Sequence, residues 1–173
     1  GVTSFDVIRS LRKNLSIKKM GHAGTLDPLA SGCLLIATGN STKLLPLFDA
    51  AEKEYIFTVC LDGRSESLDR GTPIEPVDTS SMKERTDEEI YHFLLAQKTQ
   101  IPPKYSALHI DGRRAYDLAR NGETFELKER PINIKNAIIL RRDRLSLDIQ
   151  MTISSGGYIR SFAPLIGNFM GVE

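Results

Sequence analysis

The sequence is poor in the residues that build metal sites and disulfides. It contains two cysteines and three histidines in 173 residues. Cys33 and Cys60 each stand inside an apolar run, so we expect buried free thiols rather than a disulfide or half of a metal site. The histidines are scattered without ligand spacing, which argues against a zinc or iron centre.

Long apolar runs and nucleotide-binding motifs are also missing. No apolar run approaches the roughly 20 residues that a transmembrane helix needs, and no basic-then-apolar signal segment opens the chain. The sequence has neither a Walker-type loop nor a Gly-x-Gly-x-x-Gly motif after a strand. We therefore expect a cytoplasmic protein that uses no membrane, no metal and no nucleotide cofactor.

The net charge of +1 conceals an uneven distribution. Residues 1–43 hold six Lys and Arg against two acids, residues 44–100 six against twelve, and residues 101–173 eleven against eight. If the two basic ends meet in space, they form a positive face that suits a polyanion. The alternative is a solvated surface of mixed charge.

Apolar spacing predicts interspersed helices and strands in one domain, or in two subdomains that share a core. Helices are expected after Thr3 or Ser4, after Ser41 or Thr42, from a capping box of Thr86 and Glu89, over 114–120, and up to Met170. Strands are expected over 33–37, 54–62, 131–140 and 145–153, with Gly156 and Gly157 marking a bulge or kink. The second strand places Tyr55, Phe57, Val59 and Leu61 on one side. The last alternates polar residues with an apolar row that is expected in the core, namely Leu145, Leu147, Ile149, Met151 and Ile153. Without regular β-α-β alternation, this order favours the α+β class.

The segment Gly21–Pro28 isolates one carboxylate, Asp27, between glycines and a proline. Glycine permits close backbone approach, which suits a constrained catalytic group. Asp before Pro is also common in ordinary turns, so a plain turn is the alternative.

Four segments resemble the TruB-type tRNA pseudouridine synthases, in the order and at the spacing of that family. They are Gly21–Pro28 with 39–43 after it, 53–55, 102–107 with Ala115 and Tyr116, and 157–161. The resemblance implies the pseudouridine synthase fold: a mixed, largely antiparallel central sheet flanked by helices, with an active-site cleft across the sheet. It also implies a monomer that isomerises uridine 55 in the T-arm of tRNA to pseudouridine without a cofactor.

The resemblance further implies roles for individual residues. Asp27 would be the catalytic nucleophile, attacking either the ribose or the base, and Arg160 would pair with its carboxylate. Tyr55 would stack on the target base and take part in moving a proton, and His22 would enter the space that the flipped nucleotide leaves. Each has an alternative, respectively a turn residue, a surface arginine, a core aromatic and a polar surface histidine.

Physical chemistry agrees with these roles. A carboxylate nucleophile must be ionised, and a neighbouring arginine keeps its own charge in a site that excludes water. Extrusion of a stacked base costs a few kcal/mol, part of which stacking on Tyr55 and Tyr158 recovers. We therefore predict Arg160 within salt-bridge reach of Asp27, with Tyr55 beside the same cleft.

Further residues are candidates for contacts with RNA. Gly24 and Thr25 would contact the substrate, and Lys19, Lys43, Arg113 and Arg114 would contact phosphates. Residues 101–131 resemble the insertion with which the family clasps the T-loop, recognised largely by its shape.

The chain also departs from the family pattern. It lacks the usual Lys-Pro before Gly1, has Leu165 in place of a common aspartate, has Pro164 inside an expected helix, and has His109 where lysine is frequent. It ends at Glu173, before a leucine segment and a C-terminal RNA-binding domain of the family. We therefore expect residues 1–173 to be a catalytic domain truncated at both ends.

Two other functions fit parts of the sequence. A non-catalytic module that binds or folds tRNA could use the same scaffold, although it would not need Asp27, Tyr55 and Arg160 together. Hydrolysis by paired carboxylates would need a second acid in a comparably constrained motif, which the sequence lacks.

Overall fold

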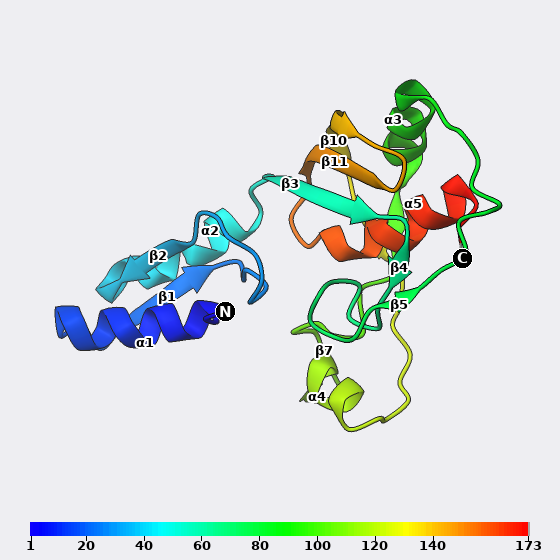
Figure 1. Cartoon of the computed structure of the whole chain (residues 1–173). Coiled ribbons are helices and arrows are strands. Elements are labelled where there is room, and N and C mark those ends of the chain that lie inside the picture. The colour runs from blue at the N-terminus through cyan, green and yellow to red at the C-terminus, as the bar shows by residue number, and fades with distance from the viewer. Residues whose placement is uncertain (173) are drawn as a thin grey trace. The chain divides into compact units, whose positions relative to one another are not determined.

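Helices and antiparallel strands are interspersed along the chain (Figure 1). The computed structural model describes residues 1–172, without the side chain of Asp49. The chain divides into two compact units, Gly1–Ala51 and Glu52–Glu173. All strand pairs among the described residues are antiparallel. The prediction of an α+β fold with antiparallel sheets is confirmed.

The first unit packs helices against a β-hairpin. Its elements are α1 (Ser4–Leu15), β1 (Met20–Ala23), β2 (Leu35–Thr38), the 3-10 helix η1 (Gly39–Leu44) and α2 (Leu45–Asp49). Strand β1 pairs with β2 from Met20 opposite Thr38 to Ala23 opposite Leu35. Part of the expected Gly21–Pro28 loop is therefore a strand.

Helix α1 begins at a capping box. The Thr3 hydroxyl accepts a hydrogen bond from the Asp6 amide at 3.1 Å, and the Asp6 carboxylate accepts one from the Thr3 amide at 3.0 Å. The predicted cap at Thr3 is confirmed. The helical spacing of Val7, Ile8, Leu11 and Leu15 predicts one apolar face. Ile8 is buried but Leu15 is 54% exposed, because only the first part of the helix is covered.

Two predictions about burial are wrong. Strand β2 starts at Leu35, which is 42% exposed, so residues 33–37 are not a buried strand. Cys33 precedes β2, and Cys60 points to the outer face of its strand; both thiols are exposed. A strand in a sheet covered on one side only has an exposed face, and a short apolar run does not show which residues lie on it.

The cap expected at Ser41 or Thr42 is also wrong. Helix η1 already begins after Thr38, whose side chain makes no capping bond. The Thr42 hydroxyl instead donates to the Gly39 carbonyl at 2.8 Å, within the helix.

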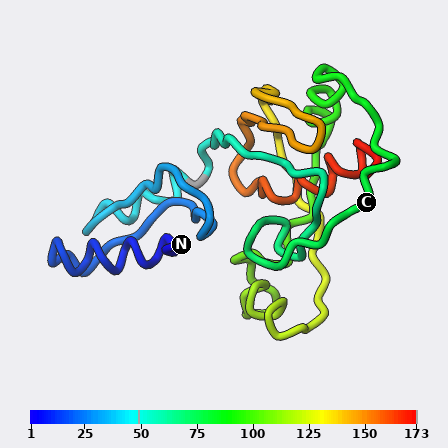
Figure 2. Tube along the Cα trace, viewed as in Figure 1, coloured from blue at the N-terminus to red at the C-terminus, as the bar shows by residue number. Residues whose placement is uncertain are grey.

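The core of the second unit is a three-stranded sheet in the order β10-β11-β3. Its strands and the two helices of the same core are β3 (Lys53–Cys60), β10 (Ile134–Arg142), β11 (Ser146–Ile153), α3 (Asp87–Ala96) and α5 (Phe162–Met170). Strands β3 and β11 are far apart in sequence but pair with Tyr55 opposite Met151. The teal and orange stretches of the tube in Figure 2 run side by side accordingly. Strict alternation buries Leu147, Ile149, Met151 and Ile153 completely, as predicted, and each such side chain stabilises the fold by about 1.5–3 kcal/mol.

Short elements complete the second unit. They are β4 (Gly63–Arg64), β5 (Glu75–Pro76), β6 (Thr99–Gln100), β7 (His109–Ile110), β8 (Arg113–Arg114), α4 (Ala115–Arg120), β9 (Arg130–Pro131) and the 3-10 helix η2 (Ile159–Ser161). The expected helix over 114–120 is confirmed as α4. Pro164 lies in the first turn of α5, where backbone amides have no partner within the helix, so the helix tolerates it.

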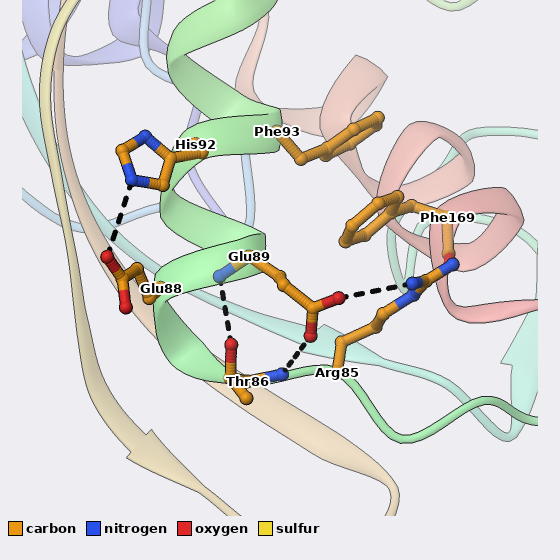
Figure 3. Close-up of a pocket in the computed structure, with 7 residues that line it drawn as sticks. All are labelled: Arg85, Thr86, Glu88, Glu89, His92, Phe93 and Phe169. Atoms are coloured by element: carbon orange, nitrogen blue, oxygen red, sulfur yellow. Dashed lines mark hydrogen bonds and ion pairs between the residues drawn. The ribbon is translucent and has the colours of Figure 1, made fainter.

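A surface hollow lies between α3 and α5 (Figure 3). The rings of Phe93 and Phe169 stack with their centroids 4.2 Å apart, and the Arg85 guanidinium lies 4.6 Å from the centre of the Phe169 ring. Arg85 also pairs with Glu89 at 3.2 Å. The hollow is therefore a packing contact between α3 and α5 in which Arg85 and Glu89 neutralise each other, and it contains none of the candidate site residues.

The capping box of α3 generates a stability prediction. The Thr86 hydroxyl accepts from the Glu89 amide at 3.1 Å, and the Glu89 carboxylate accepts from the Thr86 amide at 2.7 Å, as the sequence predicts. We expect Thr86→Ala to lower the free energy of unfolding by about 1 kcal/mol in urea denaturation. Thr124→Ala, at an exposed residue, is the control and should have no effect.

The same box predicts a dependence on pH. The bond from the Thr86 amide is the main cause that holds the pKa of Glu89 below its ordinary value. A lowered pKa in the folded state stabilises the fold above the unfolded pKa, and this stabilisation is lost as pH falls through the folded pKa. The stability difference between wild type and Glu89→Gln, which has no titrating carboxyl group at this position, should therefore shrink on acidification, and a constant difference would contradict this linkage.

The turn after β11 generates a second prediction. The strand ends at Ile153, and the chain turns at Gly156, whose φ is +82°, rather than forming a bulge. A Cβ on Gly157 would lie 2.4 Å from Cδ1 of the fully buried Ile153. Gly157→Ala should therefore destabilise the unit by about 1–3 kcal/mol through overpacking. Ile153→Val removes that methyl group, so the double variant should lose less stability than the sum of the two single variants, and losses that simply add would refute the clash.

Candidate active site

Asp27 begins a β-turn in the first unit. Its carbonyl accepts a hydrogen bond from the Ala30 amide at 2.9 Å, so the turn predicted from the Asp-Pro pair is present. The turn is tied to α1, because the Leu26 amide donates to the hydroxyl of the buried Ser4 at 3.0 Å. The Asp27 side chain is half-buried. The turn that the sequence offered as the alternative is thus present, and the role of the Asp27 carboxylate stays a prediction.

The residues just before Asp27 form a compact loop. Nδ1 of His22, at the end of β1, is hydrogen bonded to the Gly24 carbonyl. Gly24 has a φ of +74°, in the left-handed region that favours glycine. His22 is half-buried and Thr25 is exposed. His22 therefore lies folded back over its own loop rather than on an open surface.

Arg160 is a half-buried residue of η2 in the second unit, with a side chain only 13% exposed. Nη1 donates to the Ser67 carbonyl at 2.8 Å and Nη2 to the Tyr105 carbonyl at 2.9 Å. Nε lies 3.6 Å from the Asp69 carboxylate. These contacts use three directions of the planar guanidinium, which fixes its orientation. The alternative of a surface arginine is wrong.

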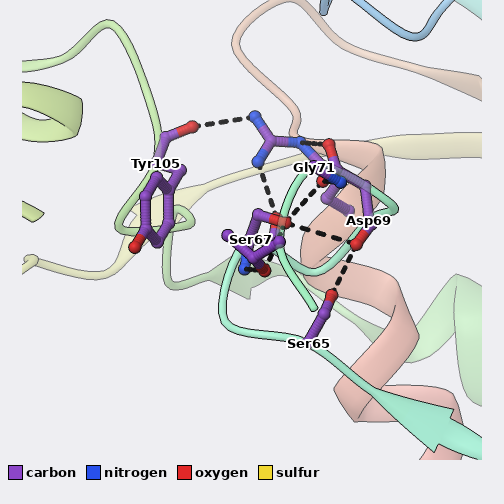
Figure 4. Close-up of polar contacts among 7 residues, drawn as sticks. Ser65, Ser67, Asp69, Gly71 and Tyr105 are labelled. Carbon is purple, nitrogen blue, oxygen red and sulfur yellow. Dashed lines mark hydrogen bonds and ion pairs between the residues drawn. The ribbon is translucent and has the colours of Figure 1, made fainter. Parts of the chain in front are cut away.

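The loop that contains Ser67 and Asp69, which Arg160 contacts, is itself held by hydrogen bonds (Figure 4). The Asp69 carboxylate accepts from the Ser67 hydroxyl at 2.6 Å and from the Gly71 amide at 2.8 Å, and the Asp69 carbonyl accepts from the Ser65 hydroxyl at 2.6 Å. Ser67 is 4% exposed. From the sequence, 63–78 is expected to form turns and loop, and that expectation did not identify these hydrogen bonds. The available signal was an Asp two residues before a Gly, which is typical of an Asx turn.

Gln100 is a further residue with a structural role that the sequence did not identify. Its carboxamide oxygen accepts from the Tyr158 amide at 2.5 Å, and its nitrogen donates to the Tyr158 carbonyl at 3.3 Å. Gln100 is 3% exposed, and next to it the Ser161 hydroxyl donates to the Ile101 carbonyl at 2.7 Å. The side chain of Gln100 thus holds the backbone of Tyr158, two residues before Arg160. No pattern in the sequence distinguishes this glutamine.

Tyr55 lies on the inner side of β3. It is half-buried and packs against the hydrophobic core. The alternation predicted for this strand is confirmed, since Val59 and Leu61 on the same side are buried while Ile56 is 69% exposed. Tyr55 is thus partly a core aromatic, as the alternative held, with part of its surface still accessible.

The arginines predicted to contact phosphates already have partners in the protein. Arg113 makes two hydrogen bonds to the Glu123 carboxylate, at 2.7 and 2.8 Å, and they hold the pKa of Glu123 below its ordinary value. Arg114 donates to the Ala107 carbonyl at 2.5 Å. Both residues are exposed, as are Lys19 and Lys43 in the first unit. Arg113 therefore also has a structural role, linking β8 to the segment after α4.

The structure thus gathers the predicted residues within each unit. His22, Gly24, Thr25 and Asp27 share one loop of the first unit, and Tyr158 and Arg160 share one segment of the second. The predicted ion pair of Asp27 with Arg160 joins residues of different units and stays a prediction.

Among the described residues, no group of three His, Cys, Asp or Glu could hold a metal ion, and no helix is long and apolar enough to cross a membrane.

Comparisons with known proteins agree on one family. Residues 12–159 match the model of the TruB family pseudouridylate synthase, N-terminal domain. The chain is 41% identical over 175 residues to tRNA pseudouridine synthase B of Ruegeria sp. (strain TM1040), covering 99% of this chain and 57% of that protein. It is 38% identical over 171 residues to the protein of that name from Campylobacter concisus (strain 13826), covering 99% and 63%.

A third relative is covered more completely. The tRNA pseudouridine synthase B of Parabacteroides distasonis is 39% identical over 176 residues, covering 98% of this chain and 75% of that protein. Among solved structures, the crystal structure of a Cbf5-Nop10-Gar1 complex matches with a TM-score of 0.68 and 24% identity, over 99% of this chain and 42% of the matched one. That likeness supports the fold alone.

The chain therefore spans between 57% and 75% of these three bacterial relatives. The family match covers the Asp27 loop, Tyr55 and the loop around Asp69, and it ends at the residue before Arg160. On this evidence the chain belongs to the TruB family of pseudouridylate synthases.

Proposed function

We propose that the chain is the catalytic part of an enzyme that isomerises uridine 55 in the T-arm of tRNA to pseudouridine. The observation that carries the proposal is the family match across a loop in which Asp27 is half-buried and held in a turn. The relatives are named tRNA pseudouridine synthase B, which supports tRNA as the substrate. The candidate residues all come from one chain, so a monomer suffices, and we place it in the cytoplasm.

The reaction is balanced without a cofactor. The bond between ribose C1′ and uracil N1 breaks, the base turns, and a bond forms between C1′ and C5. The proton on C5 leaves and N1 gains one, so substrate and product are isomers. Asp27 would attack either C1′ of the ribose or the base and would later be released unchanged.

Arg160 would keep Asp27 ionised. A carboxylate in a site that excludes water has a raised pKa unless a cation lies beside it, and arginine stays charged when buried. The contacts of Arg160 with Ser67, Tyr105 and Asp69 support this role, because a guanidinium fixed before the substrate binds needs no reorganisation during the reaction.

The other candidates would hold the extruded nucleotide. Tyr55 and Tyr158 would offer aromatic faces to the flipped base, and His22 would enter the space left in the RNA. Gly24 and Thr25 would contact the backbone of that nucleotide.

Residues 101–131 would clasp the T-loop. The segment carries the short β7–β8 hairpin and α4, and the bonds between Arg113 and Glu123 close it. Arg113 and Arg114 are exposed there and would contact phosphates on the outer side of the clasp.

Asp27→Asn tests the nucleophile. The substitution keeps the shape of the side chain but removes the attacking oxygen anion, so pseudouridine formation on unmodified tRNA should fall by about 10³-fold or more. Binding of tRNA should remain. Asp62→Asn, at an exposed residue, is the matched control and should keep full activity.

The outcome separates the two functions of this scaffold. If the wild-type protein binds tRNA and forms no pseudouridine, it is a binding module. If Asp27→Asn stays fully active, the nucleophile is another residue.

Asp69→Asn tests the positioning of Arg160. Loss of the Asp69 charge should loosen the guanidinium and slow pseudouridine formation at saturating tRNA by about 10- to 100-fold, with little change in tRNA affinity. Asp78→Asn is the matched control, because Asp78 also binds the amide two residues ahead, at 2.8 Å, but has no arginine partner among the described residues. Equal effects of the two substitutions would show that only the turn matters.

A further inference from the structure

The first unit has a strongly uneven charge. Between Ser10 and Phe48 the only acidic residue is Asp27, whereas the basic residues are Arg12, Lys13, Lys18, Lys19 and Lys43. The Arg12 guanidinium has a structural role, since it donates to the Met20 carbonyl at 2.8 Å. The four lysines are exposed, and none pairs with a carboxylate that the structure describes.

The fold gathers these lysines at one end of the unit. Arg12, in the last turn of α1, contacts Met20 at the start of β1, which places the end of the helix beside the start of the strand. The Gly39 amide, at the start of η1, donates to the Lys19 carbonyl at 2.8 Å. Figure 1 shows the same meeting of the end of α1, the start of β1 and the end of β2. We call Lys13, Lys18, Lys19 and Lys43 the lysine end.

Helix electrostatics explains only part of this cluster. Lys13 lies in the last turn of α1, where a cation complements the helix dipole. Lys18 and Lys19 lie outside any helix. Like charges without counter-charges repel one another in the folded state, and a polyanion relieves that repulsion.

We propose that the lysine end binds the phosphodiester backbone of the substrate RNA, at a place separate from the loop that receives the uridine. The inference rests on the proposed function for the identity of the RNA, and it adds Lys13 and Lys18 to the expected phosphate contacts. Strand β1 runs from the lysine end to the Asp27 loop, and its four residues span about 13 Å. A base-paired stem adjoining the target loop can therefore reach both places.

The test measures how salt weakens tRNA binding. Each phosphate contact contributes about 0.7–0.9 to the slope of log K against the logarithm of salt concentration. In the full chain, Lys13→Gln/Lys18→Gln should therefore bind unmodified tRNA more weakly, with a slope shallower by about 1.4–1.8. Lys13→Arg/Lys18→Arg keeps both charges and should retain the wild-type slope.

A matched control distinguishes the effect of the lysine end from a general effect of positive charge on tRNA binding. Lys83→Gln/Lys98→Gln removes two exposed lysines of the second unit and should leave the slope unchanged. A wild-type slope in Lys13→Gln/Lys18→Gln, or an equal loss in the control, would overturn the proposal. The slopes are measured on tRNA binding and do not depend on catalysis. A wild-type protein that binds tRNA but makes no pseudouridine would therefore refute the proposed function and leave the comparison of slopes valid.

Discussion

The second unit depends on how the Arg160 guanidinium is held. Its donors reach the carbonyls of Ser67 and Tyr105, and it lies beside the Asp69 carboxylate. These groups come from three separate segments: the loop after β4, the segment after β6, and η2. A planar cation with several donors connects these three segments, and a lysine, with one ammonium group, could not donate in all of these directions together.

The core explains why this arrangement can persist. The fully buried row on β11 ends at Ile153, and the turn at Gly156 and Gly157 leads directly to Tyr158 and η2. Gln100 then holds the backbone of Tyr158 through two hydrogen bonds. The position of Arg160 is thus set by a rigid strand, a tight turn and a buried amide, rather than by a free loop. In the first unit the bond between Ser4 and Leu26 has the same effect on the turn at Asp27.

Local sequence patterns predicted the features that depend on residues close together in the sequence, such as helix caps and strand alternation. The cap at Thr3 or Ser4, the capping box at Thr86 and the alternation along β11 were predicted, because each rests on residues a few positions apart. Failures concern burial and contacts over long distances. Cys60 was expected inside, yet it lies on the open face of β3, and the partners of Arg160 are 55 to 93 residues away. Hydrophobicity along a short run cannot say which face a neighbouring element covers.

The sequence by itself determined the class of fold, through the order of its helices and strands, and it indicated the family and the candidate carboxylate through four motifs that resemble that family. Only the tertiary structure decided how the residues around those motifs are used. It gave Arg160 a fixed orientation, gave Arg113 a carboxylate partner, and brought Lys13, Lys18, Lys19 and Lys43 to one end of a unit. The physical reason is that charge and hydrogen bonding act through space, whereas the sequence records only order along the chain.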